Sequence, residues 1–120
     1  MAGIVFLKTT DRERAVAFYT GVVGMRVWLE QPDITILRHG NLLVGLQQHD
    51  RADRDALLTF FFPTVREVDI MHERLRDRAT TQPRENRRYR IYNFFARDPD
   101  DRTIEFQCFL HELPDWGQDW

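Results

Sequence analysis

Glu105 is the residue of this chain best placed to do chemistry, because it lies in a run of alternating polar and apolar side chains. If residues 102–110 form a strand, alternate side chains point to the same face. The side chains that share the face of this acid are Thr103, Glu105, Gln107 and Phe109. A carboxylate held away from water must be paired, hydrogen-bonded or protonated. Glu105 is therefore predicted to bind a polar group of a ligand or to act as a general base; the alternatives are a partly exposed acid or one paired with Arg90 or Arg38.

An equivalent strand in the first half of the chain lacks the acid. Its alternation places Leu43, Gly45 and Gln47 on one face, so Gly45, or Val44 after a one-residue shift, stands where the second half has Glu105. Two glutamines, Gln47 and Gln107, thus accompany one carboxylate. We assign both to ligand contact, the alternative being amides that bond locally within their strands.

Aromatic side chains supply the apolar wall that a small-molecule site requires beside its few polar groups. Those assigned to the ligand site are Trp28, Phe60, Tyr92 and Phe94. A different register at the turn 98–101 would direct Asn93 and Phe95 inward in place of Tyr92 and Phe94. The alternative for all of these residues is packing in the core.

The elements that position these residues follow one order twice. The first half predicts a strand over 3–9, a helix over about 11–22 and strands over about 25–30, 33–38 and 42–48. Thr10 or Asp11 starts the helix, and Gly24 suits its left-handed end.

The pattern restarts after a polar linker at 50–55. A strand over 57–62 leads into a helix from Pro63-Thr64 to about Arg78, and two longer strands cover about 88–97 and 102–110. The sequence predicts an α+β fold of two βαβββ modules, 3–49 and 56–111, forming a curved mixed sheet around a cavity within a single 1–120 domain. In the tail, 112–120, Trp116 and Trp120 are expected to pack on the body or on a partner.

Composition narrows the classes of function. With 120 residues, 42% of them hydrophobic and 30% charged, the chain fits one soluble domain. A net charge of −2 argues against nucleic acid and membrane surfaces as partners. Cys108 is the single cysteine and is expected in the core. With no leader or apolar span in view, a cytoplasmic location is expected.

Two stretches resemble the vicinal oxygen chelate superfamily, which contains glyoxalases, bleomycin-resistance proteins and extradiol dioxygenases. The first runs from Asp11 through Phe18-Tyr19 to Gly24, and the second is Asp98-Pro99-Asp100-Asp101-Arg102-Thr103-Ile104-Glu105. The resemblance covers nearly the whole chain. It implies paired modules around a U-shaped cavity, often with a divalent metal held by the first and last strands of each module.

The resemblance also implies where metal ligands would stand, and most of those positions carry no donor. They fall on Ile4, on Leu57 or Leu58, on Gly45 or Val44, and on Glu105. One carboxylate is too few for a catalytic ion, which needs roughly three protein ligands. We therefore predict no metal and no other cofactor; the alternative is a divalent ion held by Glu105 with Gln47, Gln107 or His49.

The leading expectation is a metal-independent protein of the glyoxalase/bleomycin-resistance type that binds a hydrophobic or aromatic compound. The alternative is a glyoxalase-like lyase or isomerase, or a dioxygenase-like enzyme, that uses Glu105 with a divalent metal. A third possibility is an interaction subunit whose cavity is filled by its own side chains. The resemblance further implies a homodimer.

Overall fold

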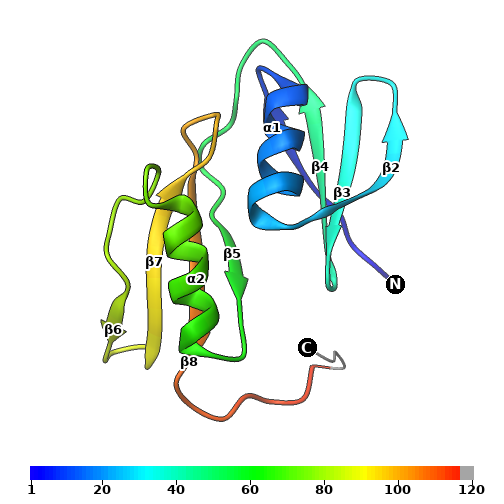
Figure 1. The fold of residues 1–120 in the computed structure, drawn as a ribbon. Helices are drawn as coiled ribbons and strands as arrows, with labels where there is room; N and C mark the ends of the chain where they lie inside the picture. Colours follow the sequence, from blue (N-terminus) through cyan, green and yellow to red (C-terminus); the bar gives the residue numbers. More distant parts are fainter. Residues whose placement is uncertain (117–120) are drawn as a thin grey trace. The chain divides into compact units, whose positions relative to one another are not determined.

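The computed structural model describes residues 1–116, which divide into two compact units. Unit 1 contains Met1–Asp55 together with Asp98–Arg102, and unit 2 contains Ala56–Arg97 and the chain from Thr103 onward. Each unit consists of one helix-bearing βαβββ module (Figure 1). The expected α+β fold with two βαβββ modules is thereby confirmed. In residues 1–116 no helix is both long and apolar enough to cross a membrane.

Unit 1 holds a mixed four-stranded sheet in the order β1-β4-β3-β2, with β1 parallel to β4. Its elements are β1 (Val5–Thr9), α1 (Arg12–Phe18), a π-helical turn η1 (Tyr19–Val23), β2 (Arg26–Gln31), β3 (Ile34–His39) and β4 (Leu42–Gln48). Of the two expected helix starts, Asp11 is the cap, and its carboxylate accepts from the Arg14 amide. Gly24 ends the helical stretch with a φ of 98°, a left-handed conformation that favours glycine.

Unit 2 repeats this arrangement in the order β5-β8-β7-β6, with β5 parallel to β8. Its elements are β5 (Leu58–Phe61), α2 (Val65–Leu75), β6 (Arg84–Asn86), β7 (Ile91–Arg97) and β8 (Thr103–Phe109). Thr64 begins α2 by accepting from the Glu67 amide. The short edge strand β6 was not among the predicted ranges, because its residues are all polar and show no alternation of apolar side chains.

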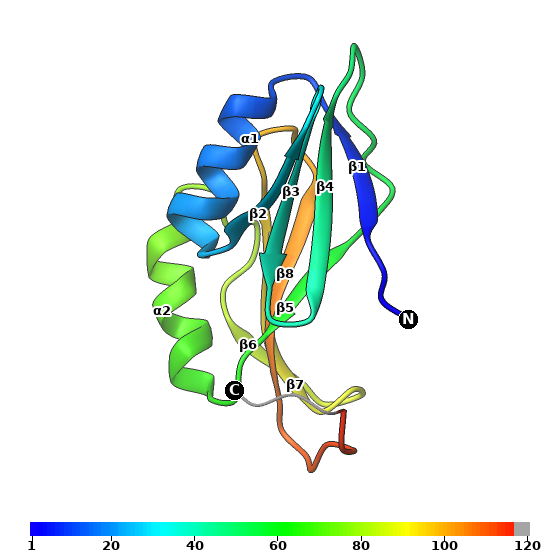
Figure 2. The ribbon, with the colours of Figure 1, turned by 90° about the vertical axis from the view of Figure 1, so that its right-hand side faces the viewer.

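The core of unit 2 lies between its sheet and α2. Figure 2 shows the ribbon of α2 beside the strands of this sheet. Val68, Met71 and Leu75 form the buried face of the helix. Phe60, Phe94 and Phe106 come from three neighbouring strands and stack with ring centroids 5.3–5.4 Å apart. Cys108 is buried on the same face, as expected, and burial followed by the charge of Glu67 raises the pKa of its thiol. The face of the sheet that points toward α2 is therefore covered by the protein's own buried side chains.

The turn between β7 and β8 belongs to unit 1, although both strands belong to unit 2. The Asp100 carboxylate accepts from the amide and the hydroxyl of Thr10, at 3.2 and 3.1 Å. The Arg14 guanidinium donates to the Pro99 carbonyl. The chain therefore leaves unit 2 after Arg97, completes unit 1 and returns.

A buried hydrogen-bond network holds this turn in place. The Arg102 side chain is fully buried and donates to the Asp98 carboxylate at 2.6 Å, to the Lys8 carbonyl at 2.8 Å, and to the carbonyl and carboxylate of Asp53 at 2.9 and 3.1 Å. The Tyr19 hydroxyl donates to Asp98 at 2.6 Å. Burial and then the charge of Asp98 raise the pKa of Tyr19. Burial opposes the charge of Arg102, yet Asp98 keeps the pKa of that guanidinium above its ordinary value.

Candidate functional site

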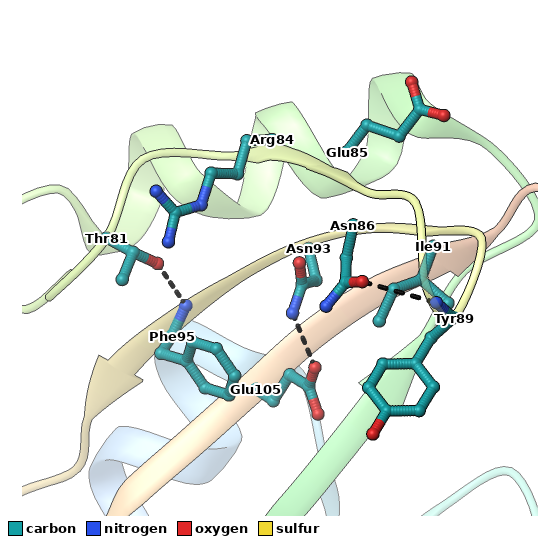
Figure 3. Close-up of a pocket in the computed structure, with 9 residues that line it drawn as sticks. All are labelled: Thr81, Arg84, Glu85, Asn86, Tyr89, Ile91, Asn93, Phe95 and Glu105. Atoms are coloured by element: carbon teal, nitrogen blue, oxygen red, sulfur yellow. Dashed lines mark hydrogen bonds between the residues drawn. The ribbon is translucent and has the colours of Figure 1, made fainter.

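Glu105 lies in the middle of unit 2, on the face of the sheet that points away from α2. It is 8% exposed, and in the strand register it stands between Thr59 on β5 and Phe95 on β7. Its Oε1 accepts from the Thr59 hydroxyl and its Oε2 from the Asn93 amide nitrogen, each at 2.8 Å. Figure 3 shows the bond from Asn93. These partners are neutral, and within the described part of unit 2 the acid forms no ion pair with Arg90.

A hollow of about 240 Å³ opens over this carboxylate. Its lining, drawn in Figure 3, is Thr81, Arg84, Glu85, Asn86, Tyr89, Ile91, Asn93, Phe95 and Glu105. The Phe95 ring and the Ile91 side chain supply apolar walls, while β6 contributes charged and amide groups. Asn86 accepts from the backbone amides of Arg88 and Tyr89, which ties the turn at the edge of the hollow.

A second hollow of about 380 Å³ adjoins the first on the same face and extends the apolar surface. The two share Tyr89, Ile91 and Glu105, and the second adds Gln107 and Phe109. Two further aromatic rings lie at the side of this second hollow: that of Phe61 lies next to Phe109, and that of Trp116 lies next to Phe61. The Phe61 ring lies 5.4 Å from that of Phe109 and 5.1 Å from that of Trp116, between ring centroids. Trp116 thus packs against its own unit, and Trp120 lies outside the described residues.

Three aromatic residues assigned to the ligand site lie on the opposite face, so that expected orientation is corrected. Phe60 and Phe94 stack on Phe106 in the core, and Phe94 is 0% exposed. Tyr92 donates to Asp69 of α2 at 2.7 Å, and this bond is the first cause that raises the pKa of Tyr92 to about 12. The five-residue turn sets the register Arg97↔Thr103, which directs Asn93 and Phe95 toward Glu105 instead.

Of the other predicted site residues, Gln107 shares the face of Glu105, whereas Gln47 and Trp28 belong to unit 1. Gln47 is half-buried on β4, opposite Lys8 and Ile34. Trp28 is 49% exposed, at a break in the register between β2 and β3. The structure therefore brings Glu105 and Gln107 together with Asn93, which was only an alternative in the sequence assignment, and with Thr59 and Tyr89, which that assignment omitted.

Of the two expected counterparts of Glu105 in unit 1, Gly45 and Val44, the strand pairing selects Gly45, and an aromatic ring covers it. In the register, Gly45 pairs with Phe6 just as Glu105 pairs with Thr59. A Cβ atom at position 45 would overlap the Phe6 ring. The first-strand neighbours of these two positions are therefore Phe6 and Thr59, one apolar and one a hydroxyl donor.

The donor set around Glu105 does not fit the divalent ion that the fold suggests. Glu105 supplies one carboxylate, its Thr59 and Asn93 neighbours are used as donors to that carboxylate, and the Asn93 nitrogen offers no lone pair to a cation. Across residues 1–116 no three His, Cys, Asp or Glu side chains gather in a group that could hold a metal ion. Gly45, at the equivalent position, provides no ligand. The residues around Glu105 therefore do not form the set of about three ligands that a catalytic divalent ion needs.

Comparison with known proteins identifies the family. Residues 3–106 match the family model described as Glyoxalase/Bleomycin resistance protein/Dioxygenase superfamily. A search of curated proteins found no match.

Several solved structures share the fold. A glyoxalase/bleomycin resistance protein/dioxygenase family enzyme from Burkholderia phytofirmans PsJN is 21% identical, with a TM-score of 0.80 over 89% of this chain and 97% of that one. A lactoylglutathione lyase from Agrobacterium tumefaciens is 20% identical, with a TM-score of 0.73 over 90% and 92%. A glyoxalase/bleomycin resistance protein/dioxygenase from Nocardioides is 17% identical, with a TM-score of 0.75 over 98% and 89%. At these identities the likeness establishes the fold alone.

Proposed function

Because this chain belongs to the glyoxalase/bleomycin resistance protein/dioxygenase superfamily, a superfold that hosts many activities, we propose a function from its own residues. The protein binds a small aromatic compound without a metal ion, and the Glu105 carboxylate accepts a hydrogen bond from a donor group of that compound. The supporting observation is the position of this acid, 8% exposed and at the floor of a hollow with aromatic and aliphatic walls.

The hydrogen bonding of Glu105 leaves room for such a donor. An ionised carboxylate offers about four lone-pair sites, and Thr59 and Asn93 use one on each oxygen. A mostly buried charge with only neutral partners gains from a further donor, most of all from a positively charged one. The compound that fits is an aromatic ring carrying an amine, amidine or similar N–H group.

The neighbouring groups orient the compound. The Phe95 and Phe109 rings and Ile91 provide the apolar contact for an aromatic ring. The Gln107 amide lies in the adjoining hollow and offers both a donor and an acceptor to a second polar group. These contacts favour a flat compound over a branched aliphatic one.

Three probes of one shape test the role of the charge: benzamidine, benzamide and benzoate, titrated by calorimetry and by amide chemical shifts. The expected order of affinity is benzamidine, then benzamide, then benzoate. A hydrogen bond to a charged group contributes about 1.5–3 kcal/mol, so Glu105→Gln should weaken benzamidine binding about 10- to 150-fold. Glu73→Gln is the matched control, since Glu73 is 72% exposed on α2, and should leave binding unchanged.

Two results would contradict the proposal. One is benzamidine binding that Glu105→Gln leaves intact. The other is micromolar binding of Ni²⁺, Mn²⁺, Zn²⁺ or Fe²⁺ that Glu105→Ala abolishes, which would favour a metal-dependent enzyme of the lyase, isomerase or dioxygenase type instead.

A further inference from the structure

A separate hollow of about 330 Å³ lies in unit 1, far along the sequence from Glu105. It is lined by Gly24, Arg26, Arg38, His39 and Gly40. These residues come from the end of η1, from the start of β2, and from the end of β3 with the turn that follows it, parts that meet at one end of the sheet of unit 1 (Figure 1).

Two arginines stand directly opposite each other in this hollow. Arg26 on β2 and Arg38 on β3 are register partners in an antiparallel pair, which places their Cβ atoms about 4.5–5.5 Å apart. Like charges in such a pair destabilise a sheet. The lining contains no acidic residue, and within residues 1–116 neither guanidinium forms an ion pair. The pair is therefore a concentration of positive charge for which residues 1–116 provide no ion-pair partner.

Two glycines border this hollow. Gly24 and Gly40 adopt φ angles of 98° and 55°, which favour glycine, and a Cβ atom at either position would meet no atom within 4 Å. The Arg38 Nε donates to the Gly40 carbonyl at 3.0 Å, which directs the guanidinium along the turn and leaves its terminal N–H groups for another acceptor. Burial lowers the pKa of His39, so the charge of the hollow at neutral pH comes from the arginines.

We propose that this hollow binds the phosphate group of a small molecule between Arg26 and Arg38. Two guanidinium groups balance the charge of a phosphate dianion, and each presents N–H donors in the planar fork that matches phosphate oxygens. The bound anion removes the repulsion between the two arginines. The volume exceeds what a phosphate group alone fills and leaves space for a small organic group attached to it.

The test measures urea unfolding as inorganic phosphate is added at constant ionic strength, with sodium chloride and sodium acetate as the other arms. The variants are Arg26→Gln, Arg38→Gln and the double variant, and Arg76→Gln is the control because Arg76 is 68% exposed and pairs with Glu73. Phosphate that binds the folded state stabilises it by RT ln(1 + [L]/Kd). Since phosphate also stabilises proteins nonspecifically, the decisive quantity is the difference between wild type and the double variant.

The expected result has two parts. Phosphate shifts the midpoint of wild type and Arg76→Gln more than that of the double variant, and each single variant weakens the apparent affinity at least about tenfold. In low salt without phosphate, the single variants are as stable as wild type or more so, because a like-charge pair has been removed. An equal phosphate response in the double variant would overturn the proposal, and an equal response to acetate would overturn the assignment to phosphate.

Discussion

Removing the buried guanidinium of Arg102 should lower the free energy of unfolding by about 3 kcal/mol. Arg102→Met keeps much of the side-chain volume but leaves the Asp98 carboxylate, 2% exposed, without its cation. Breaking one side of a buried ion pair costs about 3–5 kcal/mol. The lower end applies here, because the Tyr19 hydroxyl and two backbone amides still donate to Asp98. Losing the ion pair between Arg102 and Asp53 adds little to this loss of stability, since the Asp53 carboxylate is 39% exposed.

Urea unfolding followed by circular dichroism measures this loss. With a slope of about 1–3 kcal/mol per molar urea, the midpoint should fall by roughly 1–3 M. Arg76→Met is the matched control: its bridge to Glu73 joins side chains that are 68% and 72% exposed, so it should cost less than about 1 kcal/mol. Adding Asp98→Asn to Arg102→Met should recover part of the loss by removing the unpaired charge. The reasoning is refuted if Arg102→Met and Arg76→Met destabilise equally.

Two further predictions concern Tyr92 and Gly45. The bond to Asp69 raises the pKa of Tyr92 from 10.0 to about 12. The stability that this bond contributes is therefore complete below pH 10 and is lost as the pH rises to 12. The difference in the free energy of unfolding between wild type and Tyr92→Phe should shrink over that window, and a constant difference would contradict the assignment. Gly45→Ala should destabilise by about 1 kcal/mol, because the new Cβ overlaps the Phe6 ring and that ring, which is 50% exposed, must turn away from its rotamer. In a Phe6→Ala background the same change should cost much less, and a double-mutant cycle showing no coupling would count against this contact.

The fold could be read from the sequence largely because local signals agreed with one another. Thr64 followed by Glu67 marked a helix start that the structure has, and Gly24 marked a left-handed helix end that it also has. Alternation along residues 103–109 correctly separated the face of Glu105 from the buried face of Phe106. Such signals act within a few residues, so each could be recognised without knowledge of the tertiary structure.

The register of β7 could not be read in the same way. It depends on the turn from Asp98 to Arg102, where Asp101 adopts a φ of 65° without being glycine. A one-residue change in such a turn exchanges the two faces of a strand, so the sequence left two registers open, and the structure has the one that directs Asn93 and Phe95, rather than Tyr92 and Phe94, toward Glu105. The nearly continuous apolar and aromatic run in β7 gives no alternation that would have decided between the two registers.

The buried charges were also beyond sequence reasoning. Asp98 and Arg102 lie in a charged turn, which is a pattern typical of solvent exposure, yet both are buried in unit 1. Arg26 and Arg38 are twelve positions apart, and only the pairing of β2 with β3 makes them neighbours. The burial of the turn depends on contacts with Tyr19, Lys8 and Asp53, and the meeting of the two arginines depends on the pairing of two strands, so the residue types carry no local signal.

The contribution of Asp98–Arg102 to unit 1 has a consequence for the order of events during synthesis. Chains emerge from the ribosome N-terminus first, at about 5–20 residues per second. The strands and helix of unit 1 are complete at Gln48, but its buried charge network waits for Arg102, by which time most of unit 2 has also been made. Unit 1 therefore cannot reach its final state as an autonomous early product. Two fragments separated after Asp55 would therefore not fold as independent units. If evolution exchanges one half of the chain, the new pair of halves must still combine a compatible Asp98–Arg102 turn with residues 1–55.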